Sequence, residues 1–292
     1  MWDFNHPPHN TRLADRYQLH LTQPSACARE LLAGAADLGL IPIASLTPDL
    51  LIIPGCTIAS LSHVRSIQLI VKLSRPKSQV PHVLHSPTVQ NMGSPSANAE
   101  TLASVRTIAA DTASRSSLAY AQILFRKFIG VSPANAPEFV PAPADPIAML
   151  AHADAALLIG DPALLALESR EQIEAAAGPC LWLDLAHEWH SRTGLPWVAA
   201  VWAVSPESLT RITPSQLIED LRQSRDHGLA HVDELVHDWT PRIAIPPATI
   251  RHYLTRNIHY ALSPECIAAI SLFRRYAAEA DILPPLEHLR FL

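Results

Sequence analysis

The feature that most constrains the fold is the alternation of short apolar runs with segments of helical periodicity. The run at 155–160 is apolar throughout, and Asp161-Pro162 follows it as an N-cap and first-turn pair. Further strands are expected at 37–43, 50–53, 57–60, 64–73, 181–185 and 197–204, and helices at 24–33, 213–227, 247–257 and 264–280. Strands separated by helices predict an α/β protein with parallel strand pairs.

Composition narrows the functional class. A chain of 292 residues that is 48% hydrophobic and 17% charged is expected to form one large or two medium soluble domains. Its net charge of −5 argues against a nucleic-acid partner. No uncharged apolar run approaches the ~18–20 residues of a membrane span, and the N-terminus has no secretory signal pattern. With four cysteines and no C-x-x-C pair, we expect a cytoplasmic protein with reduced thiols and no membrane partner.

A hydroxyl-rich turn lies between an expected strand at 105–110 and the helix that follows it. It contains Ser114, Arg115, Ser116 and Ser117. Free backbone N–H groups and the positive end of the helix dipole gather at such a turn, so it is suited to bind a carboxylate. The alternative is an ordinary helix cap, for which serine is also favoured. Ser25, near the start of the helix at 24–33, is a second N-terminal anion contact of the same kind.

Other motifs are weak. His187-Glu188-Trp189-His190 is one residue short of the H-E-x-x-H spacing, so we expect no zinc site there. The chain has no nucleophile elbow, P-loop or G-x-G-x-x-G motif, and we expect neither a metal nor an organic cofactor. Residues 74–104 are rich in proline and serine with little apolar periodicity, which predicts a mobile surface insertion.

Several motifs in the same order resemble the MqnA family, the chorismate dehydratases of the futalosine route to menaquinone. The sharpest are ALLIGD at 156–161 and W-x-x-x-TGLPWV-x-AVWA at 189–203. The others are DLGLIPI at 37–43, IAS at 58–60, VRS at 64–66, SRSS at 114–117 and DL at 184–185. The resemblance covers most of residues 20 to 260 and extends more distantly to the MqnD branch, the 1,4-dihydroxy-6-naphthoate synthases.

The resemblance implies a two-lobed fold similar to the type II periplasmic binding proteins, with a ligand cleft between the lobes. Lobe I would comprise residues 1–73 and 204–292, and lobe II residues 74–203. The chain would pass between the lobes near 70–75 and 200–204. The 74–104 insertion would then follow the first passage, where family members have a much shorter connection.

The activity implied is dehydration of the dianion chorismate to 3-[(1-carboxyvinyl)oxy]benzoate by a monomer or homodimer. Ser66 occupies the position of the family's catalytic cleft serine. The expected substrate contacts are Ser25, Ser114, Arg115, Ser116, Ser117 and Asp161. Two alternatives stay open: a naphthoate synthase-like enzyme, and a catalytically impaired protein of the same fold that binds small anions.

One departure from the family concerns the N-terminus. Family members open with an apolar strand ending in Leu-Asn-x-x-Pro-Leu, whose Asn points into the cleft. This chain begins Met1-Trp2-Asp3-Phe4, which resembles the segment after that motif, and the role is not assigned to Asn5. We expect either an upstream strand, whose absence would weaken ligand binding, turnover and thermal stability, or loss of the activity.

Overall fold

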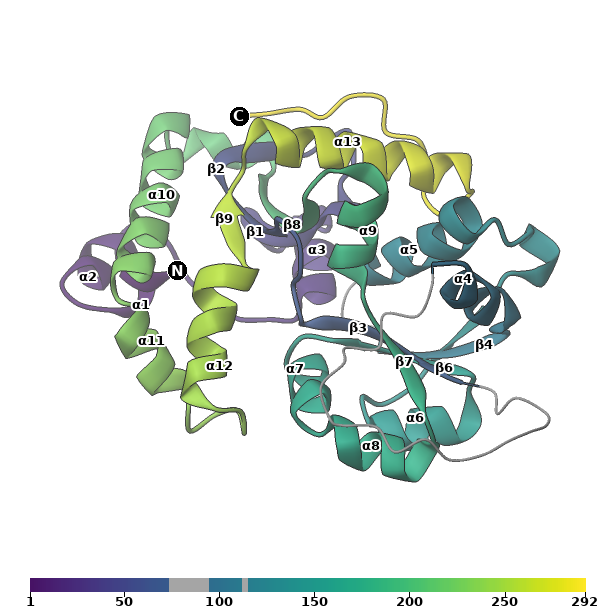
Figure 1. The fold of residues 1–292 in the computed structure, drawn as a ribbon. Coiled ribbons are helices and arrows are strands. Elements are labelled where there is room, and N and C mark those ends of the chain that lie inside the picture. The colour runs from purple at the N-terminus through teal and green to yellow at the C-terminus, as the bar shows by residue number, and fades with distance from the viewer. Residues whose placement is uncertain (74–94, 112–114) are drawn as a thin grey trace, which may run out of the picture.

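Two β-sheets form the framework of the molecule and lie one above the other in Figure 1. A computed structural model describes residues 1–73, 95–111 and 115–292. The first sheet has the order β1 (Leu38–Pro42), β8 (Trp197–Val204), β2 (Leu51–Ser60), β9 (His259–Ala261). The second has the order β5 (Glu138–Pro141), β4 (Thr107–Ala110), β6 (Ala155–Ile159), β3 (Ile67–Lys72), β7 (Cys180–Asp184).

Strand direction differs between the sheets. The ladders of the first sheet are antiparallel. In the second sheet β4 runs parallel to β5 and β6, whereas β3 runs antiparallel to β6 and β7. The expected parallel pairs therefore occur around β4, where helices connect successive strands. The chain enters β3 directly from the first sheet and not through a helix of the second. β3 therefore runs in the opposite direction to β6.

The chain passes from the first sheet to the second through residues 61–66, between β2 and β3. It returns between α9 (Leu185–Thr193) and β8, through a turn in which Gly194 has a φ of 69°. The passages expected near 70–75 and 200–204 thus fall within or beside β3 and β8. Hydropathy alone does not show where the chain crosses between the sheets, because an apolar strand has the same sequence pattern in either sheet.

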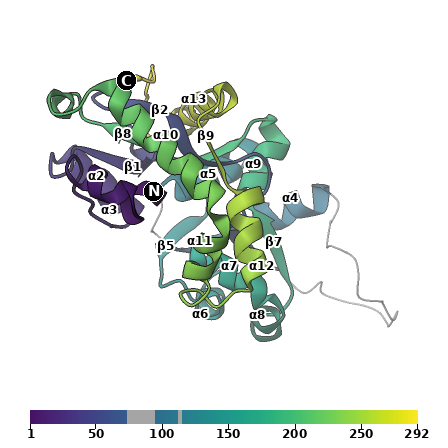
Figure 2. The same ribbon diagram turned by 90° about the vertical axis from the view of Figure 1, so that its left-hand side faces the viewer.

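Helices surround both sheets (Figures 1 and 2). α13 lies over the first sheet, and α6, α7 and α8 lie on the far side of the second sheet in Figure 1. No helix among the described residues is both long and apolar enough to cross a bilayer. The α-helices not yet given bounds are α1 (Trp2–Asn5), α2 (His9–Ala14), α3 (Pro24–Leu32), α4 (Pro95–Ser104), α5 (Arg115–Ile123), α6 (Pro146–His152), α7 (Asp161–Glu168), α8 (Arg170–Ala177), α10 (Pro214–Ala230), α11 (Val232–Trp239), α12 (Pro247–His252) and α13 (Pro264–Glu279).

The segment expected to be an insertion is only partly described. Residues 74–94 lie outside the described residues, whereas 95–104 forms α4 and not a loop. Alanine, glutamate and leucine in this stretch favour a helix. Leu102 is buried in the main core, so packing supports that local preference.

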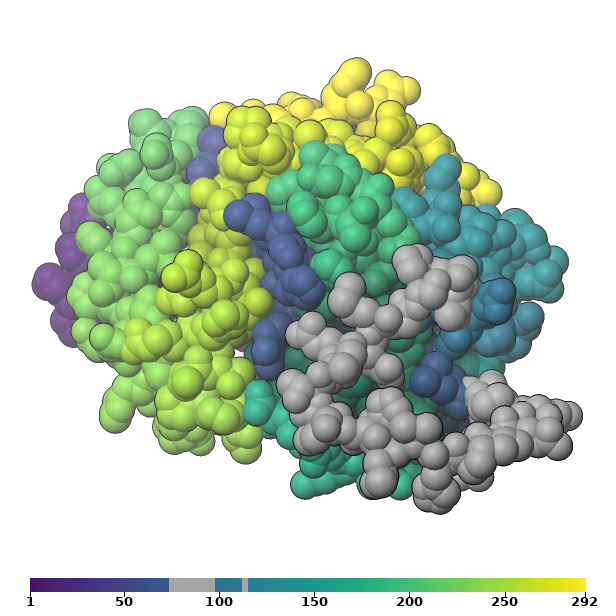
Figure 3. All heavy atoms as spheres, viewed as in Figure 1, coloured from purple at the N-terminus to yellow at the C-terminus, as the bar shows by residue number. Residues whose placement is uncertain are grey.

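Two apolar contacts join the layers of the molecule. On one side, the buried Tyr120 of α5 packs against Trp197 of β8 and Phe273 of α13. On the other, Leu164 of α7 packs with apolar residues of α11, α12 and the segment between them. Figure 3 shows segment 61–66 at the surface between α9 and α12. The start of β3 is therefore flanked by elements of both layers.

Candidate functional site

Three chain segments meet at one edge of the second sheet. Ser66 directly precedes β3, and its carbonyl accepts a hydrogen bond of 2.7 Å from the Gly160 N–H at the end of β6. β4 pairs in parallel with β6 and leads into α5, while β6 leads into α7. The N-termini of α5 and α7 therefore lie at the same edge as Ser66. Helix N-termini carry partial positive charge and unpaired N–H groups, so this edge attracts anions.

Ser66 forms a hydroxyl pair with Tyr253, which follows α12 and begins a π-helical turn (Tyr253–Asn257). The Tyr253 Oη donates to Ser66 Oγ at 3.0 Å. Burial raises the pKa of Tyr253, and the charge of Asp161 raises it further against the opposing effect of the Ser66 hydrogen bond. Tyr253 thus stays protonated and polarises the Ser66 hydroxyl. No local pattern in the sequence identifies Tyr253.

The passage that carries Ser66 is held by a half-buried capping aspartate, Asp184. Arg65 has a φ of 64°, and its N–H donates to Asp184 Oδ2 at 2.7 Å. Asp184 Oδ1 also accepts hydrogen bonds from Ala186 and His187 in the first turn of α9. Burial raises the pKa of Asp184, although these N–H donors oppose that shift. The cap anchors the backbone next to Ser66 and limits its movement.

The structure describes only part of the hydroxyl-rich turn. Ser114 lies outside them, Arg115 is exposed at the start of α5, and Ser116 and Ser117 are buried. Ser116 Oγ accepts from the Ala44 N–H at 3.2 Å and donates to the Ala199 carbonyl at 3.0 Å. Ser116 therefore ties α5 to the first sheet, and of the three described residues of this turn Arg115 is the one whose side chain is exposed.

A second arginine lies close to Arg115. Arg274 on α13 is buried and donates to the carbonyls of Ala44 and Pro284. Burial lowers the pKa of Arg274, and the neighbouring charge of Arg115 lowers it further. Two guanidinium groups and the N-terminus of α5 therefore make this region locally positive in a chain of net charge −5.

The remaining candidates occupy separate places. Ser25 is the second residue of α3 and is half-buried. Asp161 is exposed at the first position of α7, but Gly160, with a φ of 71°, takes the N-cap position expected for Asp161. The left-handed backbone required there favours glycine over aspartate. Asn5 is exposed, and its side-chain amide donates to the carbonyl of Met1, the N-cap residue of α1.

The histidine pair of α9 does not converge on one point. His187 stacks on His63, with ring centroids 4.1 Å apart. His190 Nδ1 instead lies 3.2 Å from the Leu195 carbonyl, beside the turn into β8. The two rings thus make different contacts.

The fold is that of the periplasmic binding proteins. The aliphatic sulphonate-binding protein SsuA of Escherichia coli matches with a TM-score of 0.58 at 13% identity, over 94% of this chain and 82% of its own. A Candida albicans protein described as having the generic periplasmic binding protein fold, the CA3427 gene product, matches at 0.57 with 12% identity, over 92% and 81%. Protein AF1704 of Archaeoglobus fulgidus matches at 0.64 with 14% identity, over 97% and 94%. At these identities the likeness concerns the fold alone.

The sequence comparison defines the family more narrowly. The chain belongs to the menaquinone biosynthesis family, whose sequence profile matches residues 2–279. A chorismate dehydratase of Thermus thermophilus is 33% identical over 122 residues. That alignment spans 39% of this chain and 44% of the relative, which is less than half of either protein. The expected family and fold are thereby confirmed.

Proposed function

We propose that this protein is a chorismate dehydratase, a carbon–oxygen lyase that forms 3-[(1-carboxyvinyl)oxy]benzoate and water. Membership of the menaquinone biosynthesis family and the partial match to a chorismate dehydratase support this activity. The observation that carries the proposal is the Ser66–Tyr253 hydroxyl pair at an edge where two helix N-termini meet. A dianion with a leaving hydroxyl group is the kind of substrate that this arrangement suits.

The reaction removes a proton from the ether-bearing ring carbon and the hydroxyl group from its neighbour, and the ring becomes aromatic. The ring carboxylate activates that proton through the conjugated double bond, so negative charge moves toward the carboxylate as the proton leaves. Fixed donors at the carboxylate stabilise this charge. In our proposal these donors are Arg115 and the N–H groups that begin α5, with Ser114 and Ser117 beside them, while Ser116 holds the helix in position.

Ser66 acts on the leaving hydroxyl group in this scheme. Tyr253 donates to Ser66 Oγ, which leaves the Ser66 proton free to point toward substrate. Donation from Ser66 offsets the charge that develops on the departing oxygen as the carbon–oxygen bond breaks. The departing hydroxyl group and the proton lost from the ring carbon together make up the one water molecule that is released. Asp161 at the start of α7 and Ser25 at the start of α3 are further proposed substrate contacts. The scheme uses no metal or organic cofactor.

The direct test is to incubate the purified protein with chorismate and separate the products by liquid chromatography. We expect chorismate to disappear with the formation of one equivalent of the aromatic product. Ser66→Ala serves as the matched inactive variant, and exposed Ser271→Ala on α13 as the neutral control. Binding of chorismate without any aromatic product would instead indicate a small-anion-binding protein, and would overturn the proposal.

A further inference from the structure

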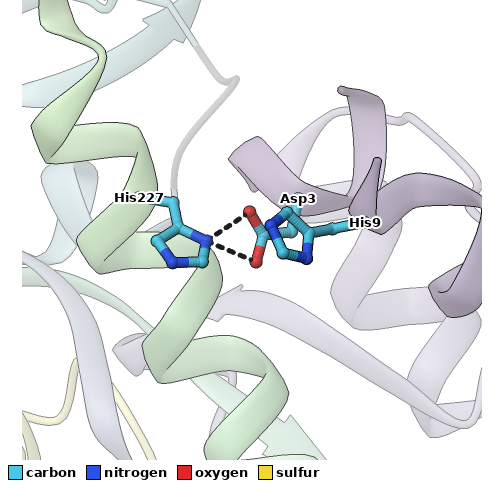
Figure 4. Close-up of side chains that lie close together, drawn as sticks. All are labelled: Asp3, His9 and His227. Atoms are coloured by element: carbon cyan, nitrogen blue, oxygen red, sulfur yellow. Dashed lines mark hydrogen bonds and ion pairs between the residues drawn. The ribbon is translucent and has the colours of Figure 1, made fainter. Parts of the chain in front are cut away.

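A second cluster of polar side chains lies far from Ser66 in the sequence and joins the N-terminal segment to α10. Asp3 of α1, His9 of α2 and His227 of α10 each place one potential ligand atom within 4.8 Å of the others. Figure 4 shows the two imidazoles and the carboxylate directed toward one another. We propose that these three residues form a zinc site that fastens the N-terminal helices to α10.

The charge of Asp3 is the first argument for a cation. Its side chain is 2% exposed, and both carboxylate oxygens face His227 Nδ1, at 2.8 and 2.9 Å. A buried carboxylate needs a compensating charge, because removing it from water is costly. A protonated His227 would supply one positive charge, and a bound divalent ion would supply two.

His9 is the second argument, because the Asp3–His227 pair does not require it. Among the described residues His9 makes a ring contact with His227, at a centroid separation of 5.0 Å, and forms no hydrogen bond. An imidazole turned toward an Asp–His pair, with its ring nitrogens unpaired there, is available as a third ligand. The two histidines come from elements more than two hundred positions apart, so helix periodicity does not account for their meeting.

The donor set and spacing suit zinc. Zn²⁺ takes imidazole nitrogen and carboxylate oxygen at about 2.0–2.2 Å, so neighbouring ligand atoms of a tetrahedral site lie roughly 3.3 Å apart. Ligand atoms that already lie within 4.8 Å reach that spacing by small side-chain rotations. The side chain of His227 is 39% exposed, which leaves solvent access for a water molecule in the fourth position.

The surrounding contacts indicate what the ion would do. Trp2 is sandwiched between the His6 and His231 rings, with centroids 3.6 and 4.6 Å away. The Asp3 N–H donates to Ser224 Oγ on α10 at 3.1 Å. The N-terminal segment is thus already docked on α10 by stacking and hydrogen bonds. A zinc ion bound between them would strengthen that docking, which assigns it a structural role outside the proposed reaction.

The test is calorimetric titration of Zn²⁺ into chelator-treated protein at pH 7.5, with thermal melts alongside. We expect one ion per chain and a melting temperature that rises with zinc concentration. His9→Gln, His227→Gln and Asp3→Asn should each lower the affinity at least about 10-fold. His152→Gln removes an exposed histidine at the end of α6 and should leave the affinity unchanged. Co²⁺ in place of Zn²⁺ should give the visible bands of tetrahedral coordination.

Three results would overturn the proposal. They are no saturable zinc binding by the unaltered chain, zinc affinity in His9→Gln and His227→Gln that equals that of the unaltered chain, or a loss of affinity in His152→Gln as large as in those two variants. His9→Gln and His227→Gln alter side chains that are partly exposed, so these two variants are expected to fold even if Asp3→Asn does not. Circular dichroism of each variant before titration establishes that.

Discussion

The Tyr253 hydroxyl lies 3.0 Å from Ser66 Oγ, although the two residues are 187 positions apart. Ser66 directly precedes β3 of the second sheet, and Tyr253 lies between α12 and β9 of the first. The hydrogen bond therefore links the two layers of the molecule at the edge where α7 begins. Any movement that separates the layers at this point breaks it.

The first prediction concerns the coupling of this pair. Ser66→Ala should lower chorismate turnover by about 10²-fold or more at a stability cost near 1 kcal/mol. Tyr253→Phe should lower turnover less, because Ser66 keeps its own proton. In the double variant the two effects should be strongly non-additive, since both residues act through one hydrogen bond. Turnover numbers and melting temperatures of the four proteins measure this. Simple additivity would show that the hydroxyls act separately.

Arg115 provides the second prediction. Its exposed guanidinium at the start of α5 is proposed to bind the ring carboxylate. Arg115→Ala should weaken the binding of a benzoate-type product analogue by about 1.5–3 kcal/mol, the range for hydrogen bonds to charged groups. The matched control is Arg211→Ala, which removes an exposed arginine paired with Asp37. If calorimetry finds that Arg115→Ala and Arg211→Ala bind the product analogue equally tightly, Arg115 does not bind the ring carboxylate.

Ser116 should behave differently from Arg115. Ser116→Ala leaves the Ala44 N–H and the Ala199 carbonyl without their bridging hydroxyl. Because the site is fully buried, we expect a loss of about 1–3 kcal/mol in the free energy of unfolding. Affinity for the product analogue should fall much less than in Arg115→Ala. Thermal melts and calorimetry on the same samples decide this, and a drop in affinity with unchanged stability would make Ser116 a direct ligand contact.

Asp154 gives a pH-dependent prediction. Partial burial acts to raise its pKa, but hydrogen bonds from the N–H groups of Arg106 and Thr107 outweigh this and lower it. The folded state therefore favours the charged carboxylate. Its stabilising contribution is present above about pH 4 and is lost as pH falls through the lowered pKa.

The corresponding variant is Asp154→Asn, with exposed Asp49→Asn as the control. At pH 7 the first should be less stable than the unaltered protein by about 1 kcal/mol, given the partial exposure of the side chain. The difference should shrink as the pH is lowered toward 2. Melting temperatures measured across that range test the sign, and a difference that grows in acid would contradict it.

The sequence indicates the chain segments around Ser66 because those signals are local. An apolar run followed by polar residues marks both the end of β6 before Asp161 and the hydroxyl-rich turn before α5. The role of Ser116 does not follow from the local sequence. Its neighbours in sequence suggest an anion contact, whereas Ala44 and Ala199, which it bonds, come from distant segments.

By itself the sequence determined where most strands and helices form and which family the chain resembles, since apolar periodicity and ordered motifs are read within short stretches. The tertiary structure alone decided that the chain changes sheets just before β3 and again just before β8, that Tyr253 meets Ser66, and that His9 meets Asp3 and His227. Each of these depends on the path of the chain between remote segments. Side-chain pairs of that kind leave no periodic pattern in the sequence, because the packing of whole elements brings them together.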